Sequence, residues 1–397
     1  MDIRPITRDE FDEYRQSFAR SFFMSQERAD SFPYLEKDMD LSRTRVLFEN
    51  KRMMSLVQIM PFQVWFNDMK IPMGGLATLL TLPENRRRGY TRRMLEYCLE
   101  DMKDNGFAIS VLYARLLGLY RKFGWEVASK FEYYSFHPDH LAEMPDVKGE
   151  IMPFDEKQIE LVNAVYDKFA KTKTCMLVRD KKHWINRVLG KYSYLWKNSK
   201  QEIEGYITYN LVPTEGGWKA DVRELVTLTH EARCGIFAFL KKLLPQIVRI
   251  TFQDPTDELS FSYFSHFSNP AFPNRGVETK ICLGFMLRII DMKKAFEFKR
   301  YSPELKGEVV FEVEDQLTPW NDGTFSLTVE KGEACLNKTS KLCQFSCDIR
   351  TISQIYCGYL DLIQAANIGQ LTIKNNTDLL KINKYFREST PYMSDRF

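Results

Sequence analysis

The segment from Leu76 to Asn105 constrains the fold of this chain more than any other. An apolar run, Leu76–Leu82, is stopped by Pro83, which cannot donate to a strand ladder. A basic loop with one glycine follows, Arg86-Arg87-Arg88-Gly89. Apolar residues then recur at helical spacing from Tyr90, and Gly106 is suited to end that helix. The segment is therefore predicted to form a strand, a short basic loop and a helix.

This junction is suited to an anionic ligand. Backbone N–H groups and the positive end of a helix dipole meet where the helix begins, an arrangement that suits a pyrophosphate. Gly89 lets the backbone approach closely, and the arginines add charge for further phosphates. Arginines at a helix N-terminus oppose the helix dipole, so helix energetics do not explain the cluster. An anionic ligand explains it better than a solvated surface does.

Composition sets wider bounds. A chain of 397 residues, 44% hydrophobic and 27% charged, is expected to form two or three globular domains. A formal net charge of +3 gives no support to nucleic-acid binding. We expect a cytoplasmic protein with reduced thiols and no membrane partner, because neither a signal peptide nor an apolar run of spanning length is present.

The metal-ligating residue types do not form a recognisable site. None of the eight cysteines makes a C-x-x-C pair. His137 and His140 lie three residues apart but have no third ligand nearby, and His183, His230 and His266 are isolated. We expect no metal.

The helix–strand pattern of the first part begins again near Ile151. Helices are predicted at Thr7–Phe22 and Phe154–Phe169, and Gly74-Gly75 is placed before a strand. Thr227 and Gly235 repeat the eight-residue spacing of Thr81 and Gly89, with Ala232 and Cys234 in place of two arginines. We interpret this as a duplication whose second phosphate loop is degenerate. A third unit follows Phe285, with a hairpin turn at Asn321-Asp322-Gly323 and helices predicted over 349–363 and 379–386.

Two motifs together resemble the GNAT acetyltransferase superfamily. Its acetyl-CoA loop has the form R/Q-x-x-G-x-G/A, which Arg86, Gly89 and Thr91 match except that Thr91 replaces a small residue. The string Tyr120-x-x-Phe123-Gly124-Trp125 is similar to the closing helix and turn of that superfamily.

The whole chain resembles the Eis (enhanced intracellular survival) acetyltransferase family. That resemblance implies a mixed α+β fold with two tandem GNAT-like domains, at residues 1–148 and 149–285. The second of these is degenerate. A sterol-carrier-protein-like α+β domain at residues 286–397 would end in the active site.

The resemblance also implies which residues bind acetyl-CoA. The strand residues would pair by backbone with the pantetheine arm, the loop would hold the phosphates, and two further residues would line the channel, where Arg115 replaces a small polar residue. These residues are Leu79, Leu80, Thr81, Arg87, Arg88, Gly89, Tyr90, Thr91, Arg92, Arg115 and Leu116.

Acetyl transfer to an amine needs a neutral amine and a proton for the leaving thiolate. A phenol has a pKa of ~10, near the ~8.5 of a thiol, so Tyr120 is a candidate general acid. The resemblance implies that the general base is the terminal carboxylate of Phe397, which is ionised at neutral pH. Asp395 is the alternative base.

The acceptor follows from the resemblance alone: amines on polycationic small molecules such as aminoglycosides. An acidic pocket wall would support it, and Asp30, Glu36, Asp38 and Asp40 are candidates for that wall. Protein lysines or an amine metabolite are alternative acceptors. A non-catalytic protein that binds acetyl-CoA and a lipid is the alternative of another class. The resemblance further implies a homo-oligomer, a hexamer.

Overall fold

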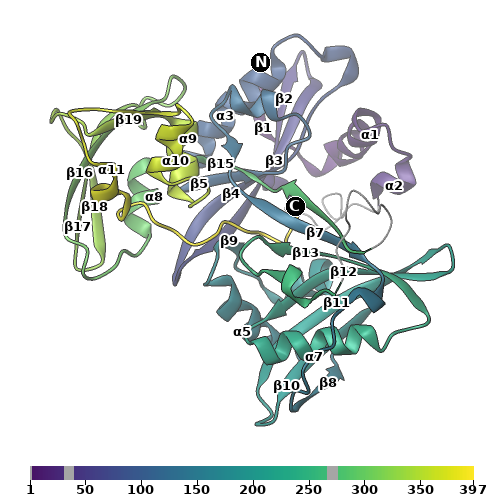
Figure 1. The fold of residues 1–397 in the computed structure, drawn as a ribbon. Coiled ribbons are helices and arrows are strands. Elements are labelled where there is room, and N and C mark those ends of the chain that lie inside the picture. The colour runs from purple at the N-terminus through teal and green to yellow at the C-terminus, as the bar shows by residue number, and fades with distance from the viewer. Residues whose placement is uncertain (1, 31–39, 266–275) are drawn as a thin grey trace.

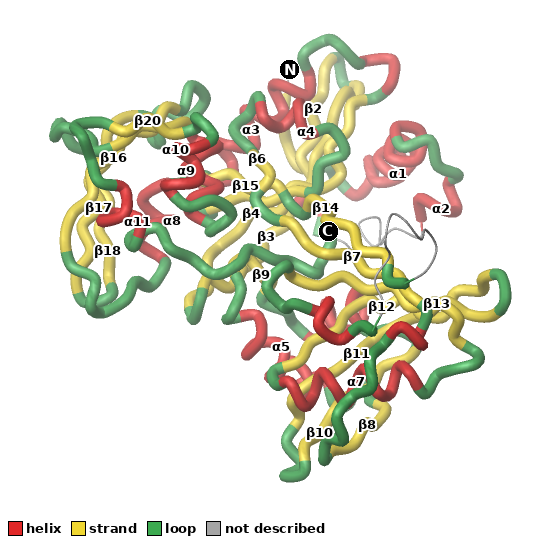
Figure 2. The backbone as a smooth tube through the Cα atoms, in the orientation of Figure 1, coloured by secondary structure: helices red, strands yellow, loops and turns green. Residues whose placement is uncertain are grey.

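The computed structural model of the chain describes residues 2–30, 40–265 and 276–397, without the side chain of Asp30. Two large mixed sheets carry helices on their faces, and a smaller sheet with its own helices lies to one side (Figures 1 and 2). The mixed α+β class predicted from the sequence is confirmed. Glu36, Asp38 and His266 lie outside the described residues.

The first sheet has the order β1-β2-β3-β4-β5-β15-β6. Asn50 and Lys51 adopt positive φ in the tight turn from β2 to β3. Gly74 and Gly75 lie inside β4, so the prediction that they precede the strand is wrong. The elements are β1 Asp2–Pro5, β2 Thr44–Glu49, β3 Arg52–Phe66, β4 Met69–Thr81, β5 Ile109–Leu112, β6 Glu126–Val127 and β15 Met286–Ile289, with β9 Thr174–Leu177 beside β3, and helices α1 Phe11–Ser21, α2 Gln26–Asp30, α3 Tyr90–Asp104 and α4 Leu117–Arg121.

The second sheet repeats this pairing with the order β8-β10-β11-β12-β13-β7-β14. In both sheets the fourth and fifth strands are parallel and their neighbours antiparallel. The helix predicted from Phe154 begins only at Ile159. The elements are β7 Lys130–Phe136, β8 Gly149–Pro153, β10 Tyr192–Asn198, β11 Ile203–Thr214, β12 Gly217–Thr227, β13 Ile247–Pro255 and β14 Glu278–Leu283, with α5 Ile159–Ala170, α6 Lys181–His183 and α7 His230–Lys241.

The two sheets exchange strands. β6 forms the edge of the first sheet, and the next strand, β7, is inserted into the second. Conversely, β14 forms the edge of the second sheet, and the next strand, β15, is inserted into the first between β5 and β6. Predicted linear ranges such as 1–148 and 149–285 therefore do not state which strands share a sheet.

The two crossing connections touch each other at Ser129 and Gly284. The Gly284 N–H donates to the Ser129 carbonyl at 2.9 Å, and the Phe285 N–H donates to Ser129 Oγ at 2.8 Å. A Cβ at Gly284 would lie 2.1 Å from Ser129 Oγ. Only glycine allows this approach without a shift of Ser129.

The third sheet has the order β18-β17-β16-β19-β20 and packs its helix α9 against β15. Ser353 Oγ of α9 accepts the Ile289 N–H at 3.0 Å. The single helix predicted over 349–363 is wrong, because the chain turns at Gly358 (φ +84°) and a second helix follows. The elements are β16 Gly307–Glu314, β17 Gly323–Glu330, β18 Glu333–Lys338, β19 Phe345–Asp348 and β20 Leu371–Ile373, with α8 Met292–Phe298, α9 Ile349–Tyr356, α10 Leu362–Asn367 and α11 Leu379–Asn383.

The last residues leave the third unit and return to the junction of the two large sheets (Figure 1, yellow trace ending at C). On the way they pair with β9: the Thr174 N–H donates to the Thr390 carbonyl at 3.0 Å, and the Tyr392 N–H donates to the Thr174 carbonyl at 2.9 Å. The C-terminal tail, residues 387–397, thus contacts all three units.

Candidate functional site

The first sheet opens where β4 and β5 separate. The two strands pair in parallel only from Met73–Ile109 to Leu76–Leu112. Beyond Leu76, β4 continues to Thr81 and keeps only β3 as a partner. The edge of β4 from Ala77 to Thr81 therefore presents backbone groups that no strand of the described residues satisfies.

A bulge in β4 lies at the start of this opening. One β3 residue, Val57, lies opposite two on β4, Thr78 and Leu79, and Thr78 has a positive φ of 51°. Such a bulge bends a strand and increases its twist. Thr78 Oγ1 donates to Gln58 Oε1 at 3.0 Å, which holds the bulge in place.

The N-terminus of α3 lies at the end of this strand. Gly89 is the N-cap residue with φ +83°, so no side chain caps the first turn, and the space above its Cα is empty. Thr91 Oγ1 lies 2.8 Å from Thr81 Oγ1, and a second hydroxyl, Ser55 Oγ, lies 3.0 Å from Thr81. The residue that departs from the superfamily pattern thus ties the helix to the strand.

Two neighbouring cavities collect the predicted site residues. One of about 830 Å³ lies in the opening of the sheet and is lined by the predicted Leu79, Leu80, Thr81, Thr91, Arg115, Leu116, Tyr120 and Phe397. The other, of about 360 Å³, lies over the start of α3 and is lined by the predicted Thr81, Arg87, Gly89, Tyr90, Thr91 and Arg92. Both share Thr81, Thr91 and Leu119, so the cavities adjoin.

Two of the predicted residues contribute differently from the rest. Arg88 lines neither cavity and lies beside the Tyr90 hydroxyl. Tyr90 itself is buried and donates from its hydroxyl to Glu49 at 2.5 Å. That carboxylate raises the pKa of Tyr90, and the Tyr90 hydroxyl thus contacts both Glu49 of β2 and the loop residue Arg88.

Tyr120 lies half-buried on α4 at the wall of the larger cavity. Its ring meets the buried Trp125 edge to face at 6.5 Å between centroids. Burial raises the pKa of Tyr120 to about 12, with a smaller contribution from the Cys98 thiol. Its hydroxyl is therefore protonated throughout the neutral and mildly alkaline range.

Phe397 occupies an aromatic seat in the same cavity. Its ring lies 4.9 Å from Phe62 and 5.7 Å from Tyr113 between centroids. Gly75 makes room for it, because a Cβ there would lie 2.6 Å from the Phe397 ring. Of these residues the sequence analysis marked only Phe397 as a site residue, and it placed Gly75 before the strand. A glycine inside a strand is the signal that marks such a close approach.

Asp395 is placed differently from what a general base requires. Its carboxylate is buried, accepts from Arg179 Nε at 3.1 Å and lies 2.7 Å from His183 Nε2. Burial alone would raise its pKa, but the Arg179 charge and the His183 hydrogen bond lower that pKa to about 2. Asp395 does not line the larger cavity, so the alternative base is not supported.

Between β12 and α7, where every residue is described, the second sheet has no counterpart of the phosphate loop. Only two residues separate β12 from α7, and Thr229 Oγ1 caps that helix by accepting the Ala232 N–H at 3.1 Å. Gly235 lies within α7 against the Trp196 ring, so its predicted correspondence with Gly89 is wrong. The remaining arginine, Arg233, is buried and paired with Asp254 at 3.0 Å.

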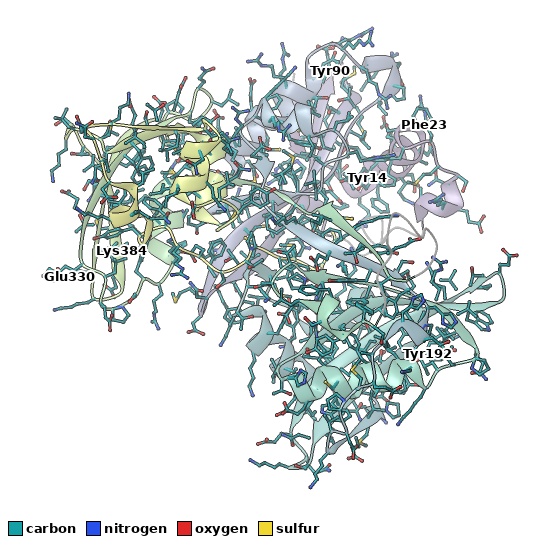
Figure 3. All side chains as sticks on the ribbon, in the orientation of Figure 1. Tyr14, Phe23, Tyr90, Tyr192, Glu330 and Lys384 are labelled. Atoms are coloured by element: carbon teal, nitrogen blue, oxygen red, sulfur yellow. The ribbon has the colours of Figure 1, made fainter. Side chains whose placement is uncertain are left out.

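No Asp or Glu lines the larger cavity among the described residues, whereas Arg86 and Arg115 do. Asp40, a candidate for an acidic wall, instead caps a short turn by accepting the Ser42 N–H. Two large apolar side chains at the lining, Phe23 and Leu116, are 83% and 70% exposed. Figure 3 shows Phe23 beside α1 at the margin of the molecule.

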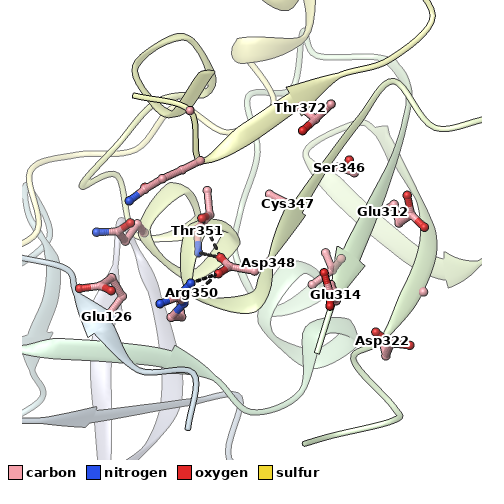
Figure 4. A pocket seen from close by; sticks show the side chains of 15 residues that line it. Glu126, Glu312, Glu314, Asp322, Ser346, Cys347, Asp348, Arg350, Thr351 and Thr372 are labelled. Atoms are coloured by element: carbon pink, nitrogen blue, oxygen red, sulfur yellow. Dashed lines mark hydrogen bonds and ion pairs between the residues drawn. The ribbon is translucent and has the colours of Figure 1, made fainter. Parts of the chain in front are cut away.

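An acidic pocket of about 650 Å³ lies elsewhere, between the third unit and β6 (Figure 4). Its carboxylates include Asp348, which accepts from the Thr351 N–H and from Arg350, and Glu126, which accepts from Arg121. None of the residues predicted for acetyl-CoA or catalysis lines it.

Within the described parts of the chain, no group of three His, Cys, Asp or Glu side chains is arranged to hold a metal ion. None of the described helices is both long and apolar enough to cross a bilayer.

Comparison with known families matches all three units. Residues 2–128 and 175–289 each match an acetyltransferase (GNAT) domain, and residues 292–394 match a sterol carrier protein domain. The second match confirms that the repeat in the sequence is a second GNAT unit.

Relatives match nearly the whole chain. An uncharacterized N-acetyltransferase of Streptomyces avermitilis is 21% identical, covering 94% of this chain and 92% of its own length. The N-acetyltransferase Eis of Mycobacterium tuberculosis is 22% identical, covering 82% and 80%. A GCN5-related N-acetyltransferase from Anabaena variabilis, 24% identical, has the same fold over 100% of both chains with a TM-score of 0.87. With its two GNAT units and sterol carrier protein unit, the chain is an N-acetyltransferase of the Eis-like GNAT family.

Proposed function

We propose that this N-acetyltransferase transfers the acetyl group of acetyl-CoA to an amine in the 830 Å³ cavity, with Tyr120 as general acid and the Phe397 α-carboxylate as general base. The observation that carries the proposal is that Tyr120, Phe397 and the unpaired edge of β4 line one cavity. That cavity adjoins the pocket over the start of α3.

The features around these cavities fit acetyl-CoA, which supplies an acetyl thioester. The unpaired backbone of Leu79–Thr81 is suited to the amide groups of a pantetheine arm. The uncapped first turn of α3, with Arg87 and Arg92 at its pocket, is suited to phosphates. The GNAT fold uses acetyl-CoA in general, and no metal is part of the proposal.

Two proton movements assign roles to the chain's own residues. The Phe397 α-carboxylate, ionised at neutral pH, accepts a proton from the ammonium of the acceptor, directly or through a water. The neutral amine attacks the thioester carbonyl and the C–S bond breaks, while the Tyr120 hydroxyl donates its proton to the departing sulfur. The second proton of the attacking nitrogen then returns to the Tyr120 oxygen, directly or through a water, so that amide, free thiol and protonated Tyr120 result. The apolar surroundings that raise the pKa of Tyr120 also raise the pKa of the departing thiol, so the two proton affinities shift in the same direction.

The lining favours an amine carried on an apolar body. Aromatic and aliphatic side chains, among them Phe22, Phe23 and Leu119, form much of the wall. A polycationic acceptor such as an aminoglycoside, which the family resemblance implies, gains no side-chain carboxylate from the described lining, and Arg86 and Arg115 repel it. Arylalkylamines are therefore the first acceptors to test, and aminoglycosides the second.

The test is thiol release from acetyl-CoA with a panel of arylalkylamines, aminoglycosides, polyamines and lysine peptides. We expect acceptor-dependent release that is fastest with the arylalkylamines. A preference for aminoglycosides would contradict the acceptor class while leaving the reaction intact. Acetyl-CoA binding without release for any amine would favour a non-catalytic binding protein instead. The homo-oligomeric state and the cytoplasmic location stay predictions.

A further inference from the structure

The second GNAT sheet opens in the same way as the first. β12 and β13 pair in parallel from Trp218–Ile247 to Asp221–Thr251 and then separate. This opening occupies the place that the proposed acetyl-CoA edge occupies in the first sheet, because both sheets have the same strand order. The described connection from β12 to α7 holds no phosphate loop, so the opening of the second sheet is available for another use.

The C-terminal tail fills this opening. Ser394 lies between the two separated strands: its hydroxyl donates to Glu224 Oε1 of β12 at 2.5 Å, and its carbonyl accepts from Gln253 Nε2 of β13 at 3.4 Å. Both strand residues lie beyond the last β12–β13 pair. A pocket of about 330 Å³ beside the tail is lined by these residues together with Arg179, Asp395 and Arg396.

Arg179 fastens the tail to the second sheet. Its side chain is 1% exposed and lies between two buried carboxylates, Glu224 at 2.6 Å and Asp395 at 3.0 Å. The guanidinium carbon also lies 3.8 Å from the Tyr166 ring centroid. Arg179 thus joins Asp395 of the tail to Glu224 of β12 through buried, charge-assisted hydrogen bonds, and this arrangement fixes Asp395 firmly.

The fixed Asp395 determines where Phe397 lies. Two residues span at most about 7 Å, so the α-carboxyl of Phe397 cannot move far from the anchor. Tyr113, which contacts the Phe397 ring, also donates from its hydroxyl to the Asp395 carbonyl at 2.5 Å. Tyr113 thus holds the tail on both sides of Arg396, at the Asp395 backbone and at the Phe397 ring.

We propose that the opening of the second sheet is a socket for the chain's own C-terminal tail, and that Arg179 and Asp395 are positioning residues that set the place of the Phe397 α-carboxyl in the acceptor cavity. This inference rests on the proposed function for the role of that carboxyl, but not for the socket itself. The degenerate GNAT unit then contributes to the reaction by holding the base.

The experiment compares the full-length protein with Asp395→Asn, which keeps the shape of the side chain and leaves Arg179 paired with Glu224. Asp254→Asn is the matched control, because Asp254 is an equally buried partner of an arginine in the same sheet and makes no hydrogen bond to the tail. Two quantities are compared: the rate at which carboxypeptidase releases Phe397, followed by intact mass, and acceptor-dependent turnover. The Kd of acetyl-CoA is measured as a control.

We expect Asp395→Asn to release Phe397 at least tenfold faster and to lose at least tenfold in kcat, with the acetyl-CoA Kd within twofold. Formate should restore part of the lost turnover by replacing the displaced carboxylate. Asp254→Asn should change neither the rate of Phe397 release nor kcat, although its thermal stability falls. Ser394→Ala, which removes only a hydroxyl, should also speed the release of Phe397 and lower kcat, to a smaller extent. It replaces Asp395→Asn in the experiment if that variant does not fold.

Two results would overturn the inference, and they differ in what else they imply. Phe397 release that is unchanged in Asp395→Asn and Ser394→Ala would show that the opening is no socket, and it leaves the proposed reaction untouched. Faster release with unchanged turnover would overturn the positioning role, because the Phe397 carboxyl would then not be the base of the proposed function.

Discussion

At the scale of single residues, burial decides what Tyr120 can do. A phenol at the wall of an apolar cavity keeps its proton over the whole neutral range, so it is available as an acid and unavailable as a base. The Phe397 α-carboxyl has the opposite tendency, since such groups are ionised at neutral pH. In the proposed reaction Tyr120 is therefore the proton donor and the Phe397 α-carboxyl the proton acceptor.

Tyr120→Phe removes the donor and keeps the ring. We expect turnover to fall by about 10²–10⁴-fold, the usual contribution of a general acid, with acetyl-CoA affinity nearly unchanged. Tyr97→Phe is the matched control, because Tyr97 lies on α3, donates to Asp101 and lines neither cavity. Equal turnover in wild type and Tyr120→Phe, measured by thiol release, would remove Tyr120 from the mechanism.

The raised pKa of Tyr120 also predicts the alkaline side of the pH profile. The acid form persists below a pKa of about 12, so loss of the Tyr120 proton should cause no fall in kcat/KM up to about pH 10. The measurement is kcat/KM against pH for the intact enzyme. A falling limb between about pH 8 and 10 that disappears in Tyr120→Phe would contradict the pKa assigned here.

At the scale of elements, two helix N-termini distinguish the GNAT units. The first turn of α3 follows an uncapped glycine with empty space above it, whereas Thr229 caps α7 from within the chain. The sequence predicted the first of these junctions well, because a stop at Pro83, a glycine and a run of arginines all mark it. It misplaced the second, because equal spacing of two glycines does not show where a helix begins.

The two junctions should respond differently to substitution. Arg87→Gln should weaken acetyl-CoA binding by about tenfold, the effect of one charge-assisted hydrogen bond, without loss of stability. Thr229→Ala should lower the free energy of unfolding by about 1 kcal/mol and leave acetyl-CoA affinity unchanged. Calorimetric binding and denaturant unfolding measure both. Weaker acetyl-CoA binding in Thr229→Ala would mean that the second unit holds the ligand as well.

At the scale of the whole molecule, strand exchange and the tail join three units into one structure. The sequence predicted the three units and their order from motifs that are local. It could not predict that β7 and β15 change sheets, or that Arg179 meets Asp395, since these contacts join segments far apart in sequence with no local pattern to mark them. The Phe397 α-carboxyl was predicted as general base only through the family resemblance, because the sequence does not show where the Phe397 ring packs.

The contact between Ser129 and Gly284, where the two connections cross, allows a test of whether the exchanged strands couple the two GNAT units. Gly284→Ala places a Cβ against Ser129 and should lower the free energy of unfolding by about 1–3 kcal/mol. Both GNAT units should lose stability together in one calorimetric transition. Gly118→Ala in α4, where a Cβ meets no neighbour, is the control and should leave stability unchanged or raise it by up to about 1 kcal/mol. Two separate transitions, with only one of them shifted, would mean that the exchanged strands do not couple the units.

The anchored tail makes a prediction for acid. The pKa of Asp395 is about 2 in the folded protein, below its ordinary value near 4, so its ionisation stabilises the fold above about pH 4 and that stabilisation is lost as the pH falls towards 2. Unfolding free energy in that window should therefore fall more steeply for the wild type than for Asp395→Asn. Parallel curves for the two proteins would contradict the depressed pKa.

The most direct test of the account is acceptor-dependent thiol release by the intact chain and by a chain with two residues added after Phe397. The addition moves the α-carboxyl by up to about 7 Å and changes no other group. We predict that the extended protein binds acetyl-CoA as the intact protein does and turns over at least a hundredfold more slowly. Equal turnover would contradict the account, because an internal residue would then be the base.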